Sequence, residues 1–459
     1  MRSITLSILC LAVISAYSQE VKREGVSTDL SHGNLKVSEN KRFLVFEDGT
    51  PFFYLGCTAW QLFHRLTREE AVMYLENRRE KGFTVIQAVA LAELDGLNTP
   101  NIYGQAPLIN NDPLRPNEGY FEHVDFIINE AEKRGIFIGL LPTWGDKVDR
   151  RWGTGPVVFA VDNAYKYGQW IATRYKDKPN IIWINGGDRP CDGEKAVWDA
   201  LGRGIKSVDK NHLMTFHPWG ESSSSSCFQD ANWLDFNMFQ SGHSDKYIAN
   251  YQMITLDYGM QPVKPCMDGE PNYEDHPVNW NGKYGWFDDE DVRRQAYWAL
   301  FAGAHGNTYG CHPIWQFLDK DRQPVGNARH TWKEVIDLPG AWDMMYVRKL
   351  MESRPFQTGI PDQTLITSDP GSQVNHIQCI RGEGYVFVYL PANSGVSLNC
   401  SKLNAANIIA WWYNPRTGEA EKIGEFKGSE SNYFQVPVSG TDWVLVLDDA
   451  ANNYPTPGY

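Results

Sequence analysis

Residues 180–190 read NIIWINGGDRP, an apolar run that ends in two glycines, an acid, an arginine and a proline. A continuously apolar strand is typical of a parallel sheet that is covered on both faces. Two consecutive glycines allow the backbone to turn sharply where such a strand ends. The stretch therefore predicts a buried parallel strand that presents Asp188 at its carboxyl end.

The same alternation of strand and helix extends on both sides of this stretch. Several of the strand-like runs are apolar throughout, and most are followed by a segment with apolar residues at helical spacing. The expected strands are 52–57, 83–91, 136–142, 180–186, 212–218, 234–242, 264–270 and 307–315. The expected helices are 68–81, 120–134, 163–176, 194–207, 246–255, 289–304 and 332–353. Eight such units predict an α/β fold, the (β/α)8 TIM barrel.

Two segments depart from the alternation. Residues 36–56 contain Asp48-Gly49 between two apolar runs, which predicts a hairpin ahead of the first barrel strand. The serine-rich segment 221–227 is expected to be a loop rather than a helix, and it is either a flexible surface loop or one that borders the site.

From about residue 357 the sequence changes to short alternating runs separated by turn residues, which predicts a small antiparallel β-sandwich. The expected organisation is thus a signal peptide at 1–18, a barrel with its hairpin at 19–356, and the sandwich at 357–459. The sandwich is either a glycan-binding module or a buttress for the barrel. Trp411 and Trp412 point to opposite faces of a strand, so at least one of them is expected in a core, which favours the buttress.

The amino terminus predicts export. Arg2 is followed by an apolar run at 4–16 and by small residues at 16–18, the pattern of a cleaved secretory signal. No other stretch is long and apolar enough for a membrane span, and the net charge of −13 argues against nucleic acid as a partner. The seven cysteines after the signal lack paired spacing, so mostly free, buried thiols with one or two disulfides at most are expected.

Catalysis in such a barrel takes place at the carboxyl ends of the strands. Asp188 follows the fourth strand and Glu270 ends the seventh, so their carboxyl groups are expected to face each other across a bound sugar. Hydrolysis of a glycosidic bond needs such a pair, an acid for the leaving oxygen and a carboxylate for the anomeric carbon. Asp188 is assigned as acid/base and Glu270 as nucleophile, with a carboxyl separation of roughly 5 to 5.5 Å if the mechanism retains configuration. The alternatives are a helix N-cap for Asp188 and a structural ion pair for Glu270.

Other polar and aromatic residues at the strand ends are expected to bind substrate. His217 and His243 are interpreted as donors to sugar hydroxyls, because no third ligand lies at metal spacing; no metal and no cofactor is expected. Glu274 is the rival nucleophile, interpreted as a supporting residue. The full set of expected substrate-binding residues is Trp60, Trp144, Arg189, His217, Trp219, Gln240, His243, Tyr273, Glu274 and Trp315.

Several stretches together closely resemble glycoside hydrolase family 140, the bacterial apiosidases that act on the pectin rhamnogalacturonan-II. They are RFLVFEDGTPFFYLGCTAW (42–60), INGGDRP (184–190), FHPWGESSSS (216–225), WLDFNMFQSGH (233–243) and DGEPNYE (268–274). The resemblance implies a retaining mechanism with Asp188 and Glu270 as the pair, although the acid in the larger clan of such barrels is usually a Glu after Asn. It also implies cleavage of an apiofuranosyl–galacturonic acid bond in the periplasm or at the cell surface, with Arg189, Arg150 or Arg151 near the acidic sugar.

Three other functions stay open at this point. The barrel could cleave another plant polysaccharide by the same mechanism, or it could bind glycans without catalysis. Glycan binding without catalysis is disfavoured, because a barrel that has lost catalysis tends to lose one of the two carboxylates, and both Asp188 and Glu270 are present. A metal-dependent hydrolase on the same fold is disfavoured because the sequence offers no cluster of His and Asp ligands.

Overall fold

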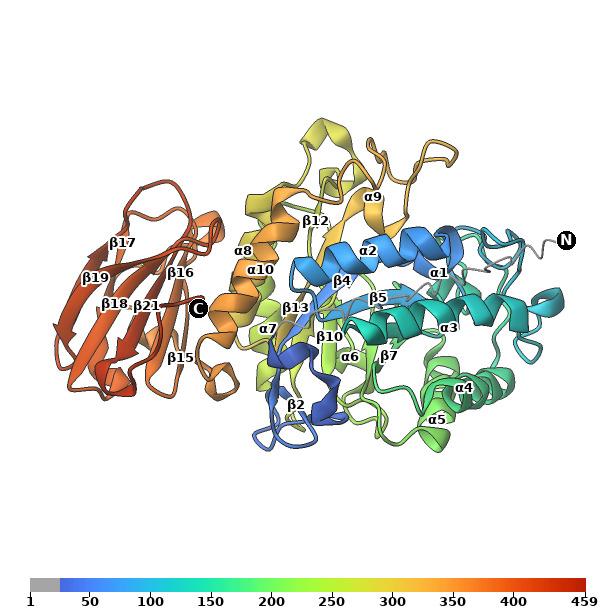
Figure 1. Ribbon diagram of the computed structural model, residues 1–459, viewed down its shortest axis with the longest axis horizontal. Coiled ribbons are helices and arrows are strands. Elements are labelled where there is room, and N and C mark those ends of the chain that lie inside the picture. The colour runs from blue at the N-terminus through green and yellow to red at the C-terminus, as the bar shows by residue number, and fades with distance from the viewer. Residues whose placement is uncertain (1–24) are drawn as a thin grey trace, which may run out of the picture.

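The computed structural model describes residues 25–459, so the expected signal peptide lies outside the described residues. Its larger part is a barrel of eight parallel strands (Figure 1). The strands are β4 (Tyr54–Thr58), β5 (Val85–Val89), β6 (Phe137–Leu141), β7 (Ile181–Gly186), β8 (Met214–His217), β10 (Asn237–Gln240), β11 (Cys266–Asp268) and β13 (Gly306–Cys311). Between β8 and β10 the barrel closes through the amide of Asp235, which donates to the carbonyl of Met214 at 2.8 Å. The predicted (β/α)8 barrel is confirmed.

Strand β7 shows why the runs are apolar throughout. Ile182 and Ile184 point into the barrel interior, whereas Ile181 and Trp183 pack against the surrounding helices. Successive side chains of a strand face opposite sides, and here both sides are buried.

Helices surround the barrel (Figure 1). They are α1 (Leu62–Arg65), α2 (Arg68–Glu80), α3 (Glu118–Lys133), α4 (Val161–Tyr175), α5 (Lys195–Val208), α6 (Ser225–Phe228), α7 (Asn250–Gly259), α8 (Asp289–Phe301), α9 (His312–Trp315) and α10 (Pro339–Glu352). Capping explains their beginnings in two cases, since Thr67 and Glu70 form a capping box on α2 and Asp288 caps α8. None of the helices in the described part of the chain is long and apolar enough to cross a membrane.

The predicted elements are shifted at three places. α7 begins four residues later than expected, and α10 begins at Pro339 rather than near 332, because proline suits the first turn of a helix. The expected last strand ends at Cys311, after which the chain forms the short helix α9.

The serine-rich segment borders the barrel mouth. Ser222 and Ser223 form β9, which pairs with β10, and the four-residue helix α6 follows. Cys227 in α6 forms a disulfide with Cys191, three residues after Asp188. The other five cysteines of the described chain are free and buried, as predicted.

The hairpin and the sandwich are also confirmed. β1 (Leu35–Val37), β2 (Leu44–Phe46) and β3 (Pro51–Phe52) form an antiparallel sheet, with Asp48-Gly49 between its last two strands. The sandwich has a six-stranded and a two-stranded sheet. Its strands are β14 (Ile360–Pro361), β15 (Gln378–Gly382), β16 (Tyr385–Leu390), β17 (Gly395–Asn399), β18 (Asn407–Tyr413), β19 (Ala420–Lys427), β20 (Ser431–Gln435) and β21 (Trp443–Asp449). The short strand β12 (Tyr273–Glu274) pairs with β13 at the barrel mouth.

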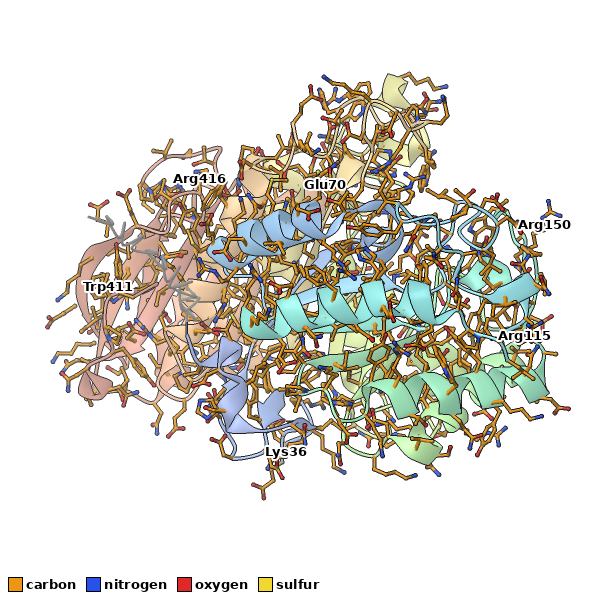
Figure 2. All side chains as sticks on the ribbon, turned by 45° about the vertical axis from the view of Figure 1, so that its right-hand side comes forward. Lys36, Glu70, Arg115, Arg150, Trp411 and Arg416 are labelled. Atoms are coloured by element: carbon orange, nitrogen blue, oxygen red, sulfur yellow. A yellow bond between two sulfur atoms is a disulfide. The ribbon has the colours of Figure 1, made fainter. Side chains whose placement is uncertain are left out.

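The sandwich packs on the barrel through one face of its larger sheet. α8 and α10 lie between the two parts in Figure 1. Tyr385 and Phe387 of β16 belong to the same apolar cluster as the barrel helices, whereas Val386 and Val388 lie in the separate core of the sandwich. In β18, where Figure 2 labels Trp411, the two tryptophans divide in the same way. Trp412 is in the sandwich core and Trp411 packs toward the barrel, so neither is presented as a sugar platform.

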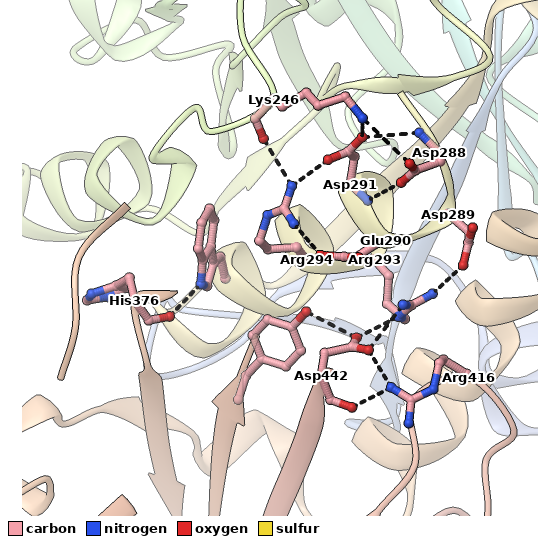
Figure 3. Close-up of polar contacts among 12 residues, drawn as sticks. Lys246, Asp288, Asp289, Glu290, Asp291, Arg293, Arg294, His376, Arg416 and Asp442 are labelled. Carbon is pink, nitrogen blue, oxygen red and sulfur yellow. Dashed lines mark hydrogen bonds and ion pairs between the residues drawn. The ribbon is translucent and has the colours of Figure 1, made fainter. Parts of the chain in front are cut away.

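Buried ion pairs join the two parts across this face (Figure 3). The guanidinium of Arg293 in α8 lies 2.6 Å from Asp442 of the sandwich and 2.5 Å from Asp343 of α10. Asp442 also accepts a hydrogen bond from Arg416 at 2.5 Å. On the other side of α8, Asp291 pairs at 2.7 Å with Lys246, which lies in the loop after β10.

Replacing Asp442 with asparagine is expected to destabilise the protein by about 3 to 5 kcal/mol, because it leaves a buried arginine without one of its carboxylate partners. Shifted urea unfolding midpoints would measure this. Glu425→Gln is the matched control, since it breaks the exposed pair with Lys422 (2.9 Å), where the expected loss is below about 1 kcal/mol. Equal midpoints for the two variants would contradict a buttressing role for the sandwich.

Candidate active site

A cavity of about 570 Å³ opens at the carboxyl ends of the barrel strands. Many of its lining residues are aromatic, and its charged side chains are mostly acidic. The lining residues used below are Trp60, Glu93, Trp144, Trp152, Asp188, Arg189, Glu221, Gln240, His243, Glu270, Tyr273, Trp280 and Trp315. Both predicted catalytic carboxylates are among them.

The backbone conformation of the turn after β7 explains how a buried strand presents Asp188 to the cavity. Gly186 and Gly187 have φ of 88° and 136°, and Asp188 follows at 51°, so three successive residues lie at positive φ. A side chain on Gly186 would lie 2.4 Å from the carbonyl oxygen of His217. Glycine is therefore required for the turn, and aspartate is one of the residues that tolerates its last position. Asp188 caps no helix, since the N-cap of α5 is Glu194.

The surroundings of Asp188 favour its protonated form. Burial and the negative charge of Glu270 raise the pKa of Asp188 to about 6, against the lowering effect of a hydrogen bond from Trp152. That bond joins the indole nitrogen to Oδ2 at 2.9 Å. A carboxyl group in this state can donate a proton at mildly acidic pH.

Arg189 was expected near the acidic sugar of the substrate, but the protein itself holds its side chain. Its guanidinium is fully buried and donates to the carbonyl oxygens of Asp149 and Asp188 at 2.7 and 2.6 Å. The ring of Trp152 lies over it, 4.4 Å from the guanidinium carbon. Arg189 therefore supports the turn and the tryptophan from behind.

Two histidines hold Glu270 in its ionised form. Nε2 of His217 lies 3.0 Å from Oε2, and Nε2 of His243 lies 3.0 Å from Oε1. Burial alone would raise the pKa of Glu270, but the hydrogen bonds and charges of the two imidazoles lower it to about 2. The residues interpreted as sugar donors are thus partners of the nucleophile, and His217 is completely buried.

The remaining predicted residues divide into three groups. Trp60, Trp144, Gln240, Tyr273 and Trp315 line the cavity as expected. Trp219 is not among the lining residues; its ring lies nearly parallel to that of Trp152, with the ring centroids 6.1 Å apart. Glu274 does not line the cavity as predicted. Its carboxylate accepts hydrogen bonds from the hydroxyl of Tyr309 and the amide of Gly340 on the helix side of the barrel.

Sequence reasoning assigned no binding role to three residues of the cavity, although it placed one of them, Glu93, at a strand end. Trp152 lies in a turn and Trp280 ends a short 3-10 helix (Val278–Trp280), both well after a strand end, where no periodicity locates them. Glu93 does follow a strand, and burial together with the charges of Asp146 and Asp188 raises its pKa to about 8. Within the described residues, no three His, Cys, Asp or Glu side chains gather as a metal site.

The arrangement places two carboxyl groups in one aromatic cavity, Asp188 with a raised pKa of about 6 and Glu270 with a lowered pKa of about 2. The pKa values of the pair are pushed apart by their surroundings, which is how one site holds an acid and a nucleophile together. This is the chemistry that cleavage of a glycosidic bond requires.

Known proteins agree with this chemistry. Residues 38–358 match the family described as "Apiosidase-like, catalytic domain", and residues 360–448 match "Putative collagen-binding domain of a collagenase". A solved structure titled "Glycoside hydrolase" is 38% identical, with a TM-score of 0.87 over 93% of this chain and 99% of that one. A glycoside hydrolase family 5 structure from Bacteroides vulgatus is 36% identical, with a TM-score of 0.89 over 95% and 97% of the two chains.

A curated rice protein, "Putative mannan endo-1,4-beta-mannosidase 9" of Oryza sativa subsp. japonica, is 26% identical over 245 residues. The match covers 46% of this chain and only 56% of the rice protein. The family match covers most of the chain, and two solved relatives align over nearly all of it. The chain therefore belongs to the apiosidase-like catalytic domain family and is a glycoside hydrolase.

Proposed function

We propose that this protein is an exported, retaining glycosidase that releases apiose-linked sugars from rhamnogalacturonan-II by cleaving an apiofuranosyl–galacturonic acid bond. The observation that carries the mechanism is that Asp188 and Glu270 line one cavity whose surroundings raise the pKa of the first and lower that of the second. Export rests on the pattern of residues 1–18.

In the first step Glu270 attacks the anomeric carbon while Asp188 gives its proton to the departing oxygen. The bond to the leaving sugar breaks and an ester bond to Glu270 forms. In the second step the Asp188 carboxylate takes a proton from water, whose oxygen attacks the anomeric carbon and releases Glu270. His217 and His243 stabilise the carboxylate that leaves, because each faces one of its oxygens.

The substrate is supported by the family description and by the sequence motifs that resemble glycoside hydrolase family 140. A second candidate is a β-mannan, which the similarity to the rice mannosidase favours. Both substrates would use the same pair of carboxylates.

The test is hydrolysis of rhamnogalacturonan-II side-chain oligosaccharides and of mannan oligosaccharides by the wild type and by Asp188→Ala, with analysis of the products. Release of an apiose-ended chain that is lost in the variant supports the proposal. Cleavage of mannan alone would leave the chemistry standing and discard apiose as the substrate.

A further inference from the structure

We propose that Trp152 and Trp219 form the subsite for the departing sugar, and that this subsite recognises the face of a pyranose ring rather than a carboxylate on it. The proposal rests on the proposed function for the identity of that sugar. It assigns two aromatic side chains, here called the tryptophan platform, to the side of the cavity where the leaving group departs.

The position of the platform follows from its contact with the acid. The indole nitrogen of Trp152 donates to Oδ2 of Asp188 at 2.9 Å. Since Asp188 protonates the leaving oxygen, the ring attached to that oxygen lies beside Asp188 and therefore beside Trp152. A second ring, Trp219, lies nearly parallel to Trp152, with an interplanar angle of 13° and centroids 6.1 Å apart.

The side chains of both tryptophans are unusually exposed to solvent for residues of their size. Trp152 is 54% and Trp219 is 40% exposed, although most other tryptophans around the cavity are buried. An exposed indole face at a site for sugars is a surface on which the apolar face of a pyranose can pack.

The platform is held in place before any ligand binds. Arg189 supports Trp152 from behind, 4.4 Å from its ring centre, and is itself fixed by two backbone carbonyls. The chain after Trp219 is tied to β10, because the amide of Glu221 donates to the carbonyl of Gln240 at 2.7 Å. The disulfide between Cys191 and Cys227 joins this segment to the loop that carries Asp188. A preformed surface binds without the entropic cost of ordering its side chains.

The charges around the platform argue against recognition of a carboxylate. The described lining of the cavity contains Glu93, Asp188, Glu221 and Glu270, and its one arginine, Arg189, is fully buried. Arg151 pairs with Asp149 at 2.6 Å. Arg150 is not among the residues that line the cavity. A uronic acid is thus held by its ring, with its carboxylate turned toward solvent.

Trp152 has a second task as a positioning residue, because its N–H bond favours the ionised form of Asp188. Trp152→Phe keeps an aromatic face but removes this bond. It is therefore expected to move the alkaline limb of the pH profile upward, which a merely structural role would not do.

Calorimetric titration tests the platform. Calorimetry with galacturonic acid and with its methyl ester, on the Glu270→Gln protein, is expected to give affinities within about twofold of each other. Adding Trp219→Ala is expected to weaken both by about 3- to 10-fold, the range of an aromatic contact. Trp342→Ala, a partly exposed tryptophan of α10 outside the cavity, is the control and is expected to change neither.

Three results would overturn the proposal: no binding of either sugar, a tenfold preference for the free acid, or unchanged affinity in Trp219→Ala. An unmoved pH profile in Trp152→Phe would remove its positioning role. Binding does not require turnover, so failure of the enzyme to cleave rhamnogalacturonan-II would count against the proposed function and leave the platform to be decided by calorimetry.

Discussion

Replacing Glu270 with glutamine is expected to lower the rate of hydrolysis by about 10⁴- to 10⁶-fold, the range in which an enzyme loses turnover with its nucleophile. Glutamine has the same shape but carries no charge, so it cannot form the ester with the anomeric carbon. Its amide can still lie between His217 and His243, which keeps the cavity and therefore sugar binding. Rates measured with saturating oligosaccharide, together with calorimetric binding, separate these two effects.

The matched control is Glu274→Gln. This carboxylate lies four residues away, but Tyr309 and Gly340 bind it on the helix side, 2.6 and 3.1 Å from its oxygens. Its replacement is expected to change the rate by only a few-fold, with its main effect on thermal stability. If Glu274→Gln were inactive and Glu270→Gln were active, Glu274 rather than Glu270 would be the nucleophile. Trapping with a 2-fluoro glycoside and mass spectrometry of the peptides should place the sugar on Glu270.

The barrel was predictable from sequence because each strand carries its signal locally. In β7 every residue from Ile181 to Ile184 is apolar, since one side of the strand fills the barrel and the other meets the helices. Once the strands are counted, the rule that catalysis occurs at their carboxyl ends locates Asp188 and Glu270 without any knowledge of the loops.

The errors concern residues whose position depends on tertiary contacts. Tyr273 and Glu274 are adjacent in β12, so one side chain enters the cavity and the other turns toward α10. Spacing alone cannot say which. The loop containing Trp152 has no periodicity, and the pairing of Cys191 with Cys227 joins segments that are 36 residues apart.

The histidines illustrate the same limit in the site itself. His217 and His243 were predicted near the substrate because they follow strands, but their partners could not be read from the sequence. In the fold, each faces one oxygen of Glu270. Their effect on the pKa of Glu270 is therefore a consequence of the barrel's geometry and not of any local motif.

Replacing Asp188 with alanine is expected to lower hydrolysis of the natural substrate by about 10²- to 10⁴-fold, the usual contribution of a general acid. The pH profile of the wild-type enzyme should show that Asp188 acts as the general acid. The raised pKa of Asp188 means that the active, protonated form predominates below about pH 6, so activity falls as the pH rises through that value. Glu270 has a lowered pKa of about 2 and stays ionised throughout this range. The optimum should therefore lie between these two values, at mildly acidic pH.

The leaving group distinguishes this explanation from simple damage to the fold. A glycosyl fluoride needs no proton for departure, so Asp188→Ala should form the ester with Glu270 at a rate close to that of the wild type, and its alkaline limb should disappear. The second step should then be slow, because no carboxylate activates water, and added azide should restore turnover as a glycosyl azide of retained configuration. If Asp188→Ala kept the alkaline limb near pH 6, or lost as much activity with the fluoride as with the natural substrate, another group would be the general acid. Glu93 would then be the next carboxyl group to replace, since its pKa is raised to about 8.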